Sequence, residues 1–127
     1  MVQPKTIKIL KSGKPKLAVK FFRQGASESE PVRDWLRSLP KDEKTAIGED
    51  IKAVQFGWPL GLPLVDHVSG DIWEVRTKLG NRIARVLFVI EEGVMVLLHG
   101  FIKKTQKTPM PDLNLAKDRL KRLRGTK

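Results

Sequence analysis

The chain has 127 residues and no cysteine, and its 25 Lys and Arg against 14 Asp and Glu give a formal net charge of +11. This length fits one domain with a buried core. The lack of cysteine excludes disulfides, a thiolate nucleophile and a Cys-based zinc site, and two isolated histidines, His67 and His99, do not build a metal site alone. The charge predicts a polyanionic partner, with nucleic acid favoured over an anionic membrane or an acidic protein.

The first residues, 1–15, mix Lys, Gly, Ser and Pro with little apolar periodicity, which predicts a flexible basic leader. They lack the apolar segment of a signal peptide. The longest apolar run, residues 83–90, is interrupted by Arg85 and is too short to cross a bilayer. We therefore expect a cytoplasmic protein with no membrane partner, whose single domain spans residues 16–127.

Residues 16–57 predict one strand and two helices. In KLAVKFFRQ, residues 16–24, apolar side chains recur with a period of two, which is typical of a strand. The stretch SESEP then offers a capping serine and places Pro31 in the first turn of a short amphipathic helix. Pro40 ends this helix, and a second one runs to Gly57 with an apolar stripe of Ala46, Ile47, Ile51 and Val54.

The remaining chain predicts a loop, three strands and a helix. FGWPLGLPLVDHVSG, residues 56–70, is dense in Gly and Pro yet carries large apolar side chains, so we interpret it as a loop pinned to the core. Three strand-like runs follow, DIWEVRTKL, RIARVLFVI and VMVLLHGFI, with tight turns near Gly80 and Gly93 that indicate an antiparallel meander. DLNLAKDRLKRL predicts a final helix with the apolar face Leu113, Ala116, Leu120 and Leu123.

The predicted fold is therefore α+β: an N-terminal strand and a helical hairpin packed on an antiparallel four-stranded sheet, with a C-terminal helix. Strand alternation puts Glu74 and Arg76 on one face of this sheet. Arg85 lies in an apolar row, where a charge requires a partner, and its ordinary interpretation is an ion pair with Glu74 across the Gly80 turn. In the last strand, alternation places five residues on one face: Met95, Leu97, His99, Phe101 and Lys103.

Seven polar side chains are thus predicted to converge near one end of the sheet: Glu74, Arg76, Arg85, His99, Lys103, Lys104 and Lys107. A carboxylate, an imidazole and several cations suit phosphodiester chemistry, because RNA is cut without a metal when its own 2′-hydroxyl is deprotonated and cations stabilise the phosphate charge. Each residue also has an ordinary interpretation. His99 alone is more often a hydrogen-bonded strand histidine than a catalyst, and the lysines alone are usually solvated charges.

The segment IWEVRTKLGNRIARVLFVI followed by VMVLLHGFIKKTQKTP resembles the RelE/ParE superfamily, specifically its phage-derived HigB-like toxins. Residues 71–109 are the most specific part of this resemblance. It implies a RelE/ParE-like fold and the toxin of a type II toxin-antitoxin module. Many RelE-like toxins are ribosome-dependent mRNA endonucleases, so it also implies mRNA and the ribosome as partners, with no cofactor and no metal. A cognate helix-turn-helix antitoxin would cover the basic surface with an acidic segment.

Carried over residue by residue, the resemblance assigns the general base to Glu74 and the phosphate-contacting arginine to Arg85. Lys103 and Lys104 match basic positions that stabilise charge, and His99 is the candidate acid. The candidate RNA-binding residues are Arg76, Arg82, Lys107, Lys117 and Lys121. Several relatives carry a tyrosine near the C-terminus, whereas this chain has none.

Two other functions fit the basic surface. A ParE-like inhibitor of a DNA topoisomerase would cause DNA damage without cleaving mRNA. A non-catalytic RNA-binding protein would bind RNA in a salt-sensitive way and leave it intact. The predicted grouping of a carboxylate and an imidazole with cations favours an enzyme, because a protein that only grips phosphate gains nothing from a carboxylate.

Overall fold

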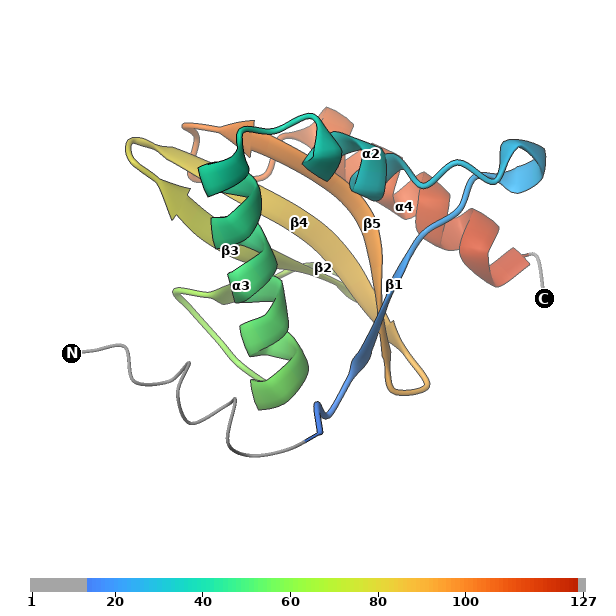
Figure 1. The fold of residues 1–127 in the computed structure, drawn as a ribbon. Coiled ribbons are helices and arrows are strands. Elements are labelled where there is room, and N and C mark those ends of the chain that lie inside the picture. The colour runs from blue at the N-terminus through green and yellow to red at the C-terminus, as the bar shows by residue number, and fades with distance from the viewer. Residues whose placement is uncertain (1–13, 126–127) are drawn as a thin grey trace.

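The computed structural model describes residues 14–125, so almost all of the predicted leader at residues 1–15 lies outside the described part. Figure 1 shows the elements in chain order: β1 (Ala18–Phe21), the 3-10 helix η1 (Gly25–Ser27), α2 (Pro31–Arg37), α3 (Lys41–Gly57), β2 (Val65–Ser69), β3 (Ile72–Leu79), β4 (Arg82–Glu91), β5 (Val94–Lys103) and α4 (Met110–Gly125). The two predicted helices, the three strands of the meander and the final helix are confirmed.

The strands form one five-stranded mixed sheet in the order β1-β5-β4-β3-β2. Strands β2 to β5 pair antiparallel, whereas β1 pairs parallel with β5 at one edge. The predicted α+β class is confirmed, but the four strands and the purely antiparallel pairing are wrong. The missed strand is β2, which lies in the stretch interpreted as a loop. Its five residues follow Gly61 and Pro63, so its alternation is too short to distinguish it from a loop.

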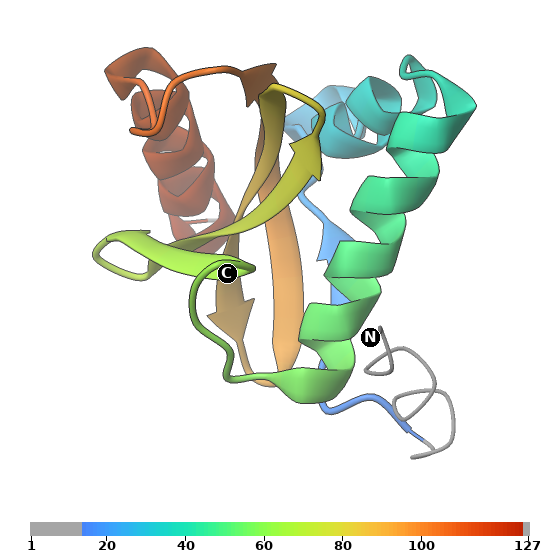
Figure 2. The ribbon, with the colours of Figure 1, turned by 90° about the vertical axis from the view of Figure 1, so that its left-hand side faces the viewer.

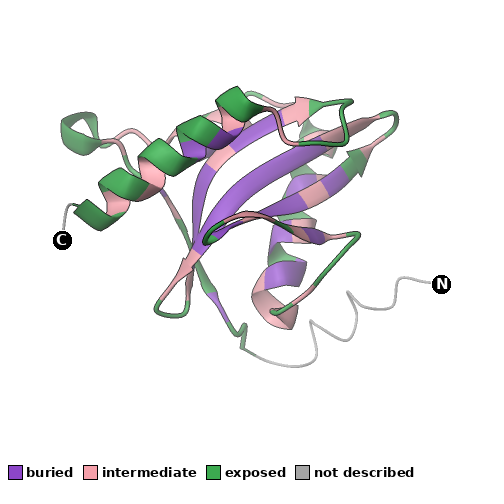
Figure 3. Cartoon of the chain, turned by 180° about the vertical axis from the view of Figure 1, so that it is seen from behind, coloured by how far each residue is buried: buried purple, intermediate pink, exposed green. Residues whose placement is uncertain are grey.

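Helices cover both faces of the sheet, as Figure 2 shows. Helices α2 and α3 pack on one face, where Ile47 and Val54 of α3 join the larger apolar cluster. Helix α4 packs on the other face through the predicted apolar stripe, with Leu113 and Ala116 buried and the outer side of the helix exposed (Figure 3). None of the described helices combines the length and apolarity needed to span a membrane.

The backbone geometry agrees with most of the predicted helix ends and turns. Pro31 occupies the start of α2, where its fixed φ suits the first turn and no N–H is needed. The N-cap is Glu30 and not the predicted serine, and it makes no side-chain capping hydrogen bond. The turns at Gly80 (φ 64°) and Gly93 (φ 79°) have left-handed conformations, which glycine adopts without steric cost.

A β-bulge in β5 changes which of its side chains share a face. Leu97 lies opposite Phe88, whereas His99 lies opposite Leu87, so Leu98 is an extra residue in the strand. Its carbonyl oxygen accepts a 2.8 Å hydrogen bond from Nη1 of Arg119 in α4. The prediction of one common face is therefore wrong, because period-two alternation fails at a bulge. Met95 and Leu97 face α2 and α3, and the residues on the α4 side are His99, Phe101 and Lys103.

Candidate functional site

Strand register brings the predicted site residues into two neighbouring rows on the α4 face of the sheet. The first row, across β3, β4 and β5, consists of Glu74, Leu87 and His99. The second row consists of Arg76, Arg85 and Phe101. Because paired strands lie about 4.8 Å apart, these rows place a carboxylate, two guanidinium groups and an imidazole within one small area.

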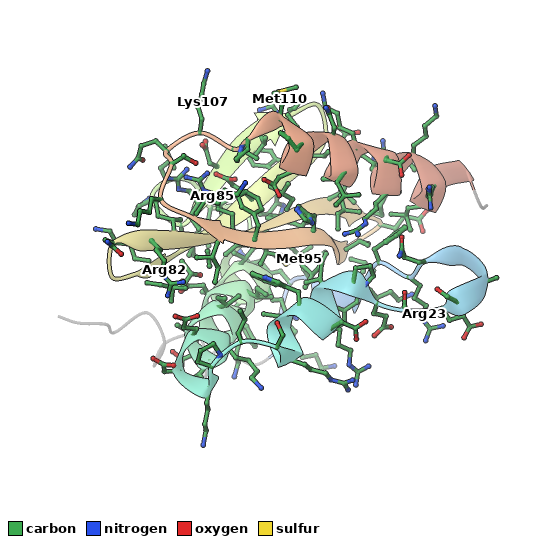
Figure 4. All side chains as sticks on the ribbon, turned by 90° about the horizontal axis from the view of Figure 1, so that it is seen from above. Arg23, Arg82, Arg85, Met95, Lys107 and Met110 are labelled. Atoms are coloured by element: carbon green, nitrogen blue, oxygen red, sulfur yellow. The ribbon has the colours of Figure 1, made fainter. Side chains whose placement is uncertain are left out.

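Arg85 is fully buried and binds the loop of residues 104–109, which connects β5 to α4. Its Nη1 donates a 2.8 Å hydrogen bond to the carbonyl oxygen of Lys107. Its Nη2 donates to the carbonyl oxygens of Gln106, at 2.8 Å, and Thr105. Burial lowers the pKa of Arg85 and the charge of Glu74 opposes this shift, but arginine remains protonated. The buried charge therefore fixes the path of the loop. Figure 4 shows Arg85 beside this loop.

Glu74 is only 1% exposed and both of its oxygens are occupied. Oε2 accepts a 3.0 Å hydrogen bond from Nη1 of Arg76, and Oε1 accepts a 2.7 Å hydrogen bond from the hydroxyl of Thr108. The predicted ion pair with Arg85 is wrong, because Arg76, and not Glu74, lies opposite Arg85 in the register. Glu74 thus anchors the second end of the loop whose first part Arg85 holds.

Replacing Thr108 with Val tests this anchor. We expect the free energy of unfolding to fall by about 1–3 kcal/mol, because a buried carboxylate oxygen loses its hydrogen bond. Urea denaturation measures the change. Thr45→Val on the exposed face of α3 is the matched control, with an expected change within about 0.5 kcal/mol. Equal stability of the two variants would contradict the contact between Thr108 and Glu74.

His99 belongs to a second polar group beside the first. Its Nε2 lies 2.7 Å from Oδ1 of Asp112, in the first turn of α4, and its ring stacks on Phe101 with the centroids 5.5 Å apart. Nζ of Lys103 lies 3.4 Å from Oδ2 of Asp112. Burial lowers the pKa of His99 below its usual range, and the hydrogen bond with Asp112 opposes this shift. The imidazole is therefore mostly neutral at pH 7.

Asp112 is the site residue that sequence reasoning missed. An acidic residue in the first turn of a helix is common, because it complements the helix dipole, so nothing in the sequence marks this one as a partner of His99. The pairing depends on the bulge at Leu98, which places His99 on the α4 side. Only the packing of α4 on β5 brings the two side chains together.

The lysine that ends β5 and two lysines of the loop after it line the exposed rim of the site. Lys103 has 47% of its side chain exposed despite its contact with Asp112. Lys104 and Lys107 are exposed on the loop, and Figure 4 shows the Lys107 side chain pointing away from Arg85. These three ammonium groups are available to a phosphate, whereas the guanidinium of Arg85 is occupied by carbonyl oxygens.

Three predicted RNA-binding residues lie outside this area. Arg82 points to the opposite face of the sheet, where it forms an ion pair with Glu43 of α3 (Figure 4). Lys117 and Lys121 are exposed on α4. Lys121 lines a separate cavity of about 730 Å³ beside β1, together with Phe22. Arg76, by contrast, lies in the site and its Nη2 is 3.4 Å from Oε1 of Gln106 in the loop.

Within the described residues, no group of three or more His, Asp or Glu side chains is placed to hold a metal ion. The family model for phage-derived protein Gp49-like (DUF891) matches residues 34–121. This match covers both polar groups of the site and the whole loop between β5 and α4. No curated protein matches the chain. The match agrees with the predicted phage-derived origin, and it is consistent with a toxin of a toxin-antitoxin module in general.

Proposed function

Because the chain belongs to the phage-derived Gp49-like family, we propose that it is a HigB-like toxin of a type II toxin-antitoxin module, of the RelE/ParE kind, which cleaves mRNA at the ribosome. The observation that carries this proposal is that the two polar groups lie in neighbouring rows on the α4 face of the sheet, with exposed lysines beside them. A cognate helix-turn-helix antitoxin would neutralise it by placing an acidic segment on the basic surface.

The proposed reaction is metal-independent cleavage of the RNA backbone. The 2′-oxygen attacks the adjacent phosphorus and the bond to the 5′-oxygen breaks, which leaves a 2′,3′-cyclic phosphate and a 5′-hydroxyl. Negative charge grows on the phosphate oxygens in the transition state, and ammonium groups stabilise it. Lys103 and Lys104 are the exposed cations nearest to His99 along the chain, so we assign this role to them. Arg85 supports them indirectly, because it fixes the loop that carries Lys104.

The experiment adds purified protein to translating ribosomes and maps new RNA ends. We expect cleavage products with 5′-hydroxyl ends, and a loss of about 100-fold in rate for the Lys103→Ala, Lys104→Ala double variant. Lys44→Ala, an exposed lysine on α3, is the control and should cleave like the wild type. Intact mRNA with the wild-type protein would refute the nuclease, and an equal rate for the double variant would refute the role of the two lysines.

Non-catalytic RNA binding is the second candidate function. The observation that favours it is the state of Glu74, which is buried with both oxygens bonded and thus presents no free carboxylate to a substrate. Salt-sensitive binding of mRNA that remains uncut would support this function. Cleavage in the ribosome experiment would exclude it as the full account.

A further inference from the structure

We infer that His99 is the general base of the proposed reaction and that Asp112 is the positioning residue that holds its imidazole with the hydrogen on Nε2. The inference rests on the proposed function and deepens it, because it moves the base from Glu74 to a different strand. Asp112 thereby gains a role that the sequence alone does not suggest.

Glu74 is poorly placed to accept a proton from a substrate. A base must come within hydrogen-bond distance of the hydroxyl that it deprotonates. Glu74 is 1% exposed, and its two oxygens accept hydrogen bonds from Arg76 and Thr108. Access would require the loop to leave both Glu74 and Arg85. The geometry therefore gives Glu74 a structural role in this conformation.

The imidazole of His99, in contrast, is oriented to accept a proton from a substrate. A carboxylate oxygen only accepts hydrogen bonds, so the 2.7 Å contact with Oδ1 of Asp112 requires the hydrogen of the neutral ring to lie on Nε2. The lone pair then lies on Nδ1. Among the described residues Nδ1 has no hydrogen-bond partner. It is not one of the fully buried unpaired atoms, and the side chain is 15% exposed, so Nδ1 is the ring nitrogen left to a substrate. A substrate hydroxyl can therefore donate to Nδ1.

The charges around His99 favour its neutral, proton-accepting form. Asp112 of α4 is the anion that faces it, and Arg119 of α4 and Lys103 of β5 are the cations. Burial and the two cations lower the pKa of the imidazole, and together they outweigh the effect of the carboxylate. Below this pKa the ring is protonated and cannot act as a base. The rate should consequently fall on the acidic side of the pH profile, at a pH lower than that of an ordinary histidine.

The step balances without a cofactor. Nδ1 of His99 takes the proton of the 2′-hydroxyl while the 2′-oxygen forms its bond to phosphorus. The bond between phosphorus and the 5′-oxygen breaks, and the 5′-oxygen takes a proton from water. The imidazolium then returns its proton to solvent. Lys103, which lies 3.4 Å from Oδ2 of Asp112, brings a positive charge to the same place.

Nitrogen NMR of the two histidines tests the tautomer without any activity. His67 is the internal reference, because its Nε2 lies 2.6 Å from the carbonyl oxygen of Gly70 and must donate to it when neutral. We expect His99 to carry its hydrogen on Nε2 and to titrate below pH 6.5, and Asp112→Asn to lower its midpoint further. A ring with its hydrogen on Nδ1, or a midpoint above 6.5, would overturn the inference even if the protein cleaves RNA.

Kinetics with translating ribosomes test the roles. We expect His99→Asn to reduce the cleavage rate about 100-fold or more, and Asp112→Asn about 10-fold or more with the acidic limb of the pH profile changed. Asp112→Glu should restore part of the rate. Asp42→Asn, in the first turn of α3, is the matched control and should behave like the wild type.

The comparison with Glu74→Gln separates the possible failures. If His99→Asn cleaves normally while folded Glu74→Gln does not, the inference is wrong and the proposed function stands. If the wild type cleaves no RNA at all, the proposed function fails, and the NMR experiment still decides whether Asp112 sets the tautomer. Thermal melting shows in each case that the variant is folded.

Discussion

Replacing Arg85 with Ala is expected to lower the free energy of unfolding by about 2–4 kcal/mol. The substitution empties the space of a fully buried side chain and leaves the carbonyl oxygens of Thr105, Gln106 and Lys107 without their charged donor. Urea denaturation gives the loss of stability, and hydrogen exchange of the loop amides shows where the structure opens. The proposed cleavage of RNA should fall as well, because the loop carries Lys104 and leads into α4.

Two further variants sharpen this result. Arg85→Lys keeps the charge but lacks the planar fork that reaches several carbonyl oxygens, so its stability should lie between those of the wild type and the alanine variant. Arg122→Ala is the control, because within residues 14–125 this exposed arginine forms its ion pair with the exposed Asp118 one turn away on α4. A loss below about 1 kcal/mol for Arg85→Ala would contradict a structural role for the buried guanidinium.

Replacing Gly100 with Ala is expected to destabilise the fold by about 2–3 kcal/mol. A β-carbon at this position would lie 2.4 Å from Cε3 and Cζ3 of Trp35, whose ring packs against the strand from α2. Such a distance is far below van der Waals contact, so the helix or the indole must shift. Thermal or urea unfolding measures the loss.

Gly48→Ala is the matched control for this prediction. Gly48 lies inside α3 and a β-carbon there would meet nothing within 4 Å, so the change should stabilise the protein by about 0.5–1 kcal/mol. In the Gly100→Ala background, Trp35→Leu should recover part of the loss, because it removes the clash. Additive effects of Gly100→Ala and Trp35→Leu would show that the indole is not the obstacle.

The sequence predicts those parts of the fold that depend on local patterns. The period-two alternation of β3 correctly places Glu74 and Arg76 on one face, and the glycine turns correctly define the meander. The parallel direction of β1 was not predicted. A long connection through two helices allows parallel or antiparallel pairing, and no turn residue distinguishes the two. Strand β2 has five residues, so its alternation of apolar and polar side chains is too short to outweigh the nearby Gly and Pro residues, which predict a loop.

The sequence predicts that several strand residues of the candidate site lie close together, but it does not predict their contacts, the participation of Asp112 or the distant positions of Arg82, Lys117 and Lys121. Glu74, Arg85 and His99 do meet on one side of the sheet, as their strands require. The partners differ because the register pairs Arg85 with Arg76, and because backbone carbonyls, which every residue has, leave no mark in the sequence. Asp112 approaches His99 only through the packing of α4, and long-range packing of this kind has no local signature.

Because Leu98 is an extra residue, odd-numbered side chains of β5 face α2 and α3 before the bulge and face α4 after it. Two residues of helix α4 contact this bulge and the residue after it. Arg119 donates a hydrogen bond to the carbonyl oxygen of Leu98, and Asp112 binds the imidazole of His99, which the bulge turns toward α4. A change that loosens α4 from the sheet would thus disturb both the bulge in β5 and the orientation of His99. Folding stability and the proposed proton transfer should therefore decline in parallel across variants of this helix, even where the substituted residue touches neither His99 nor Leu98.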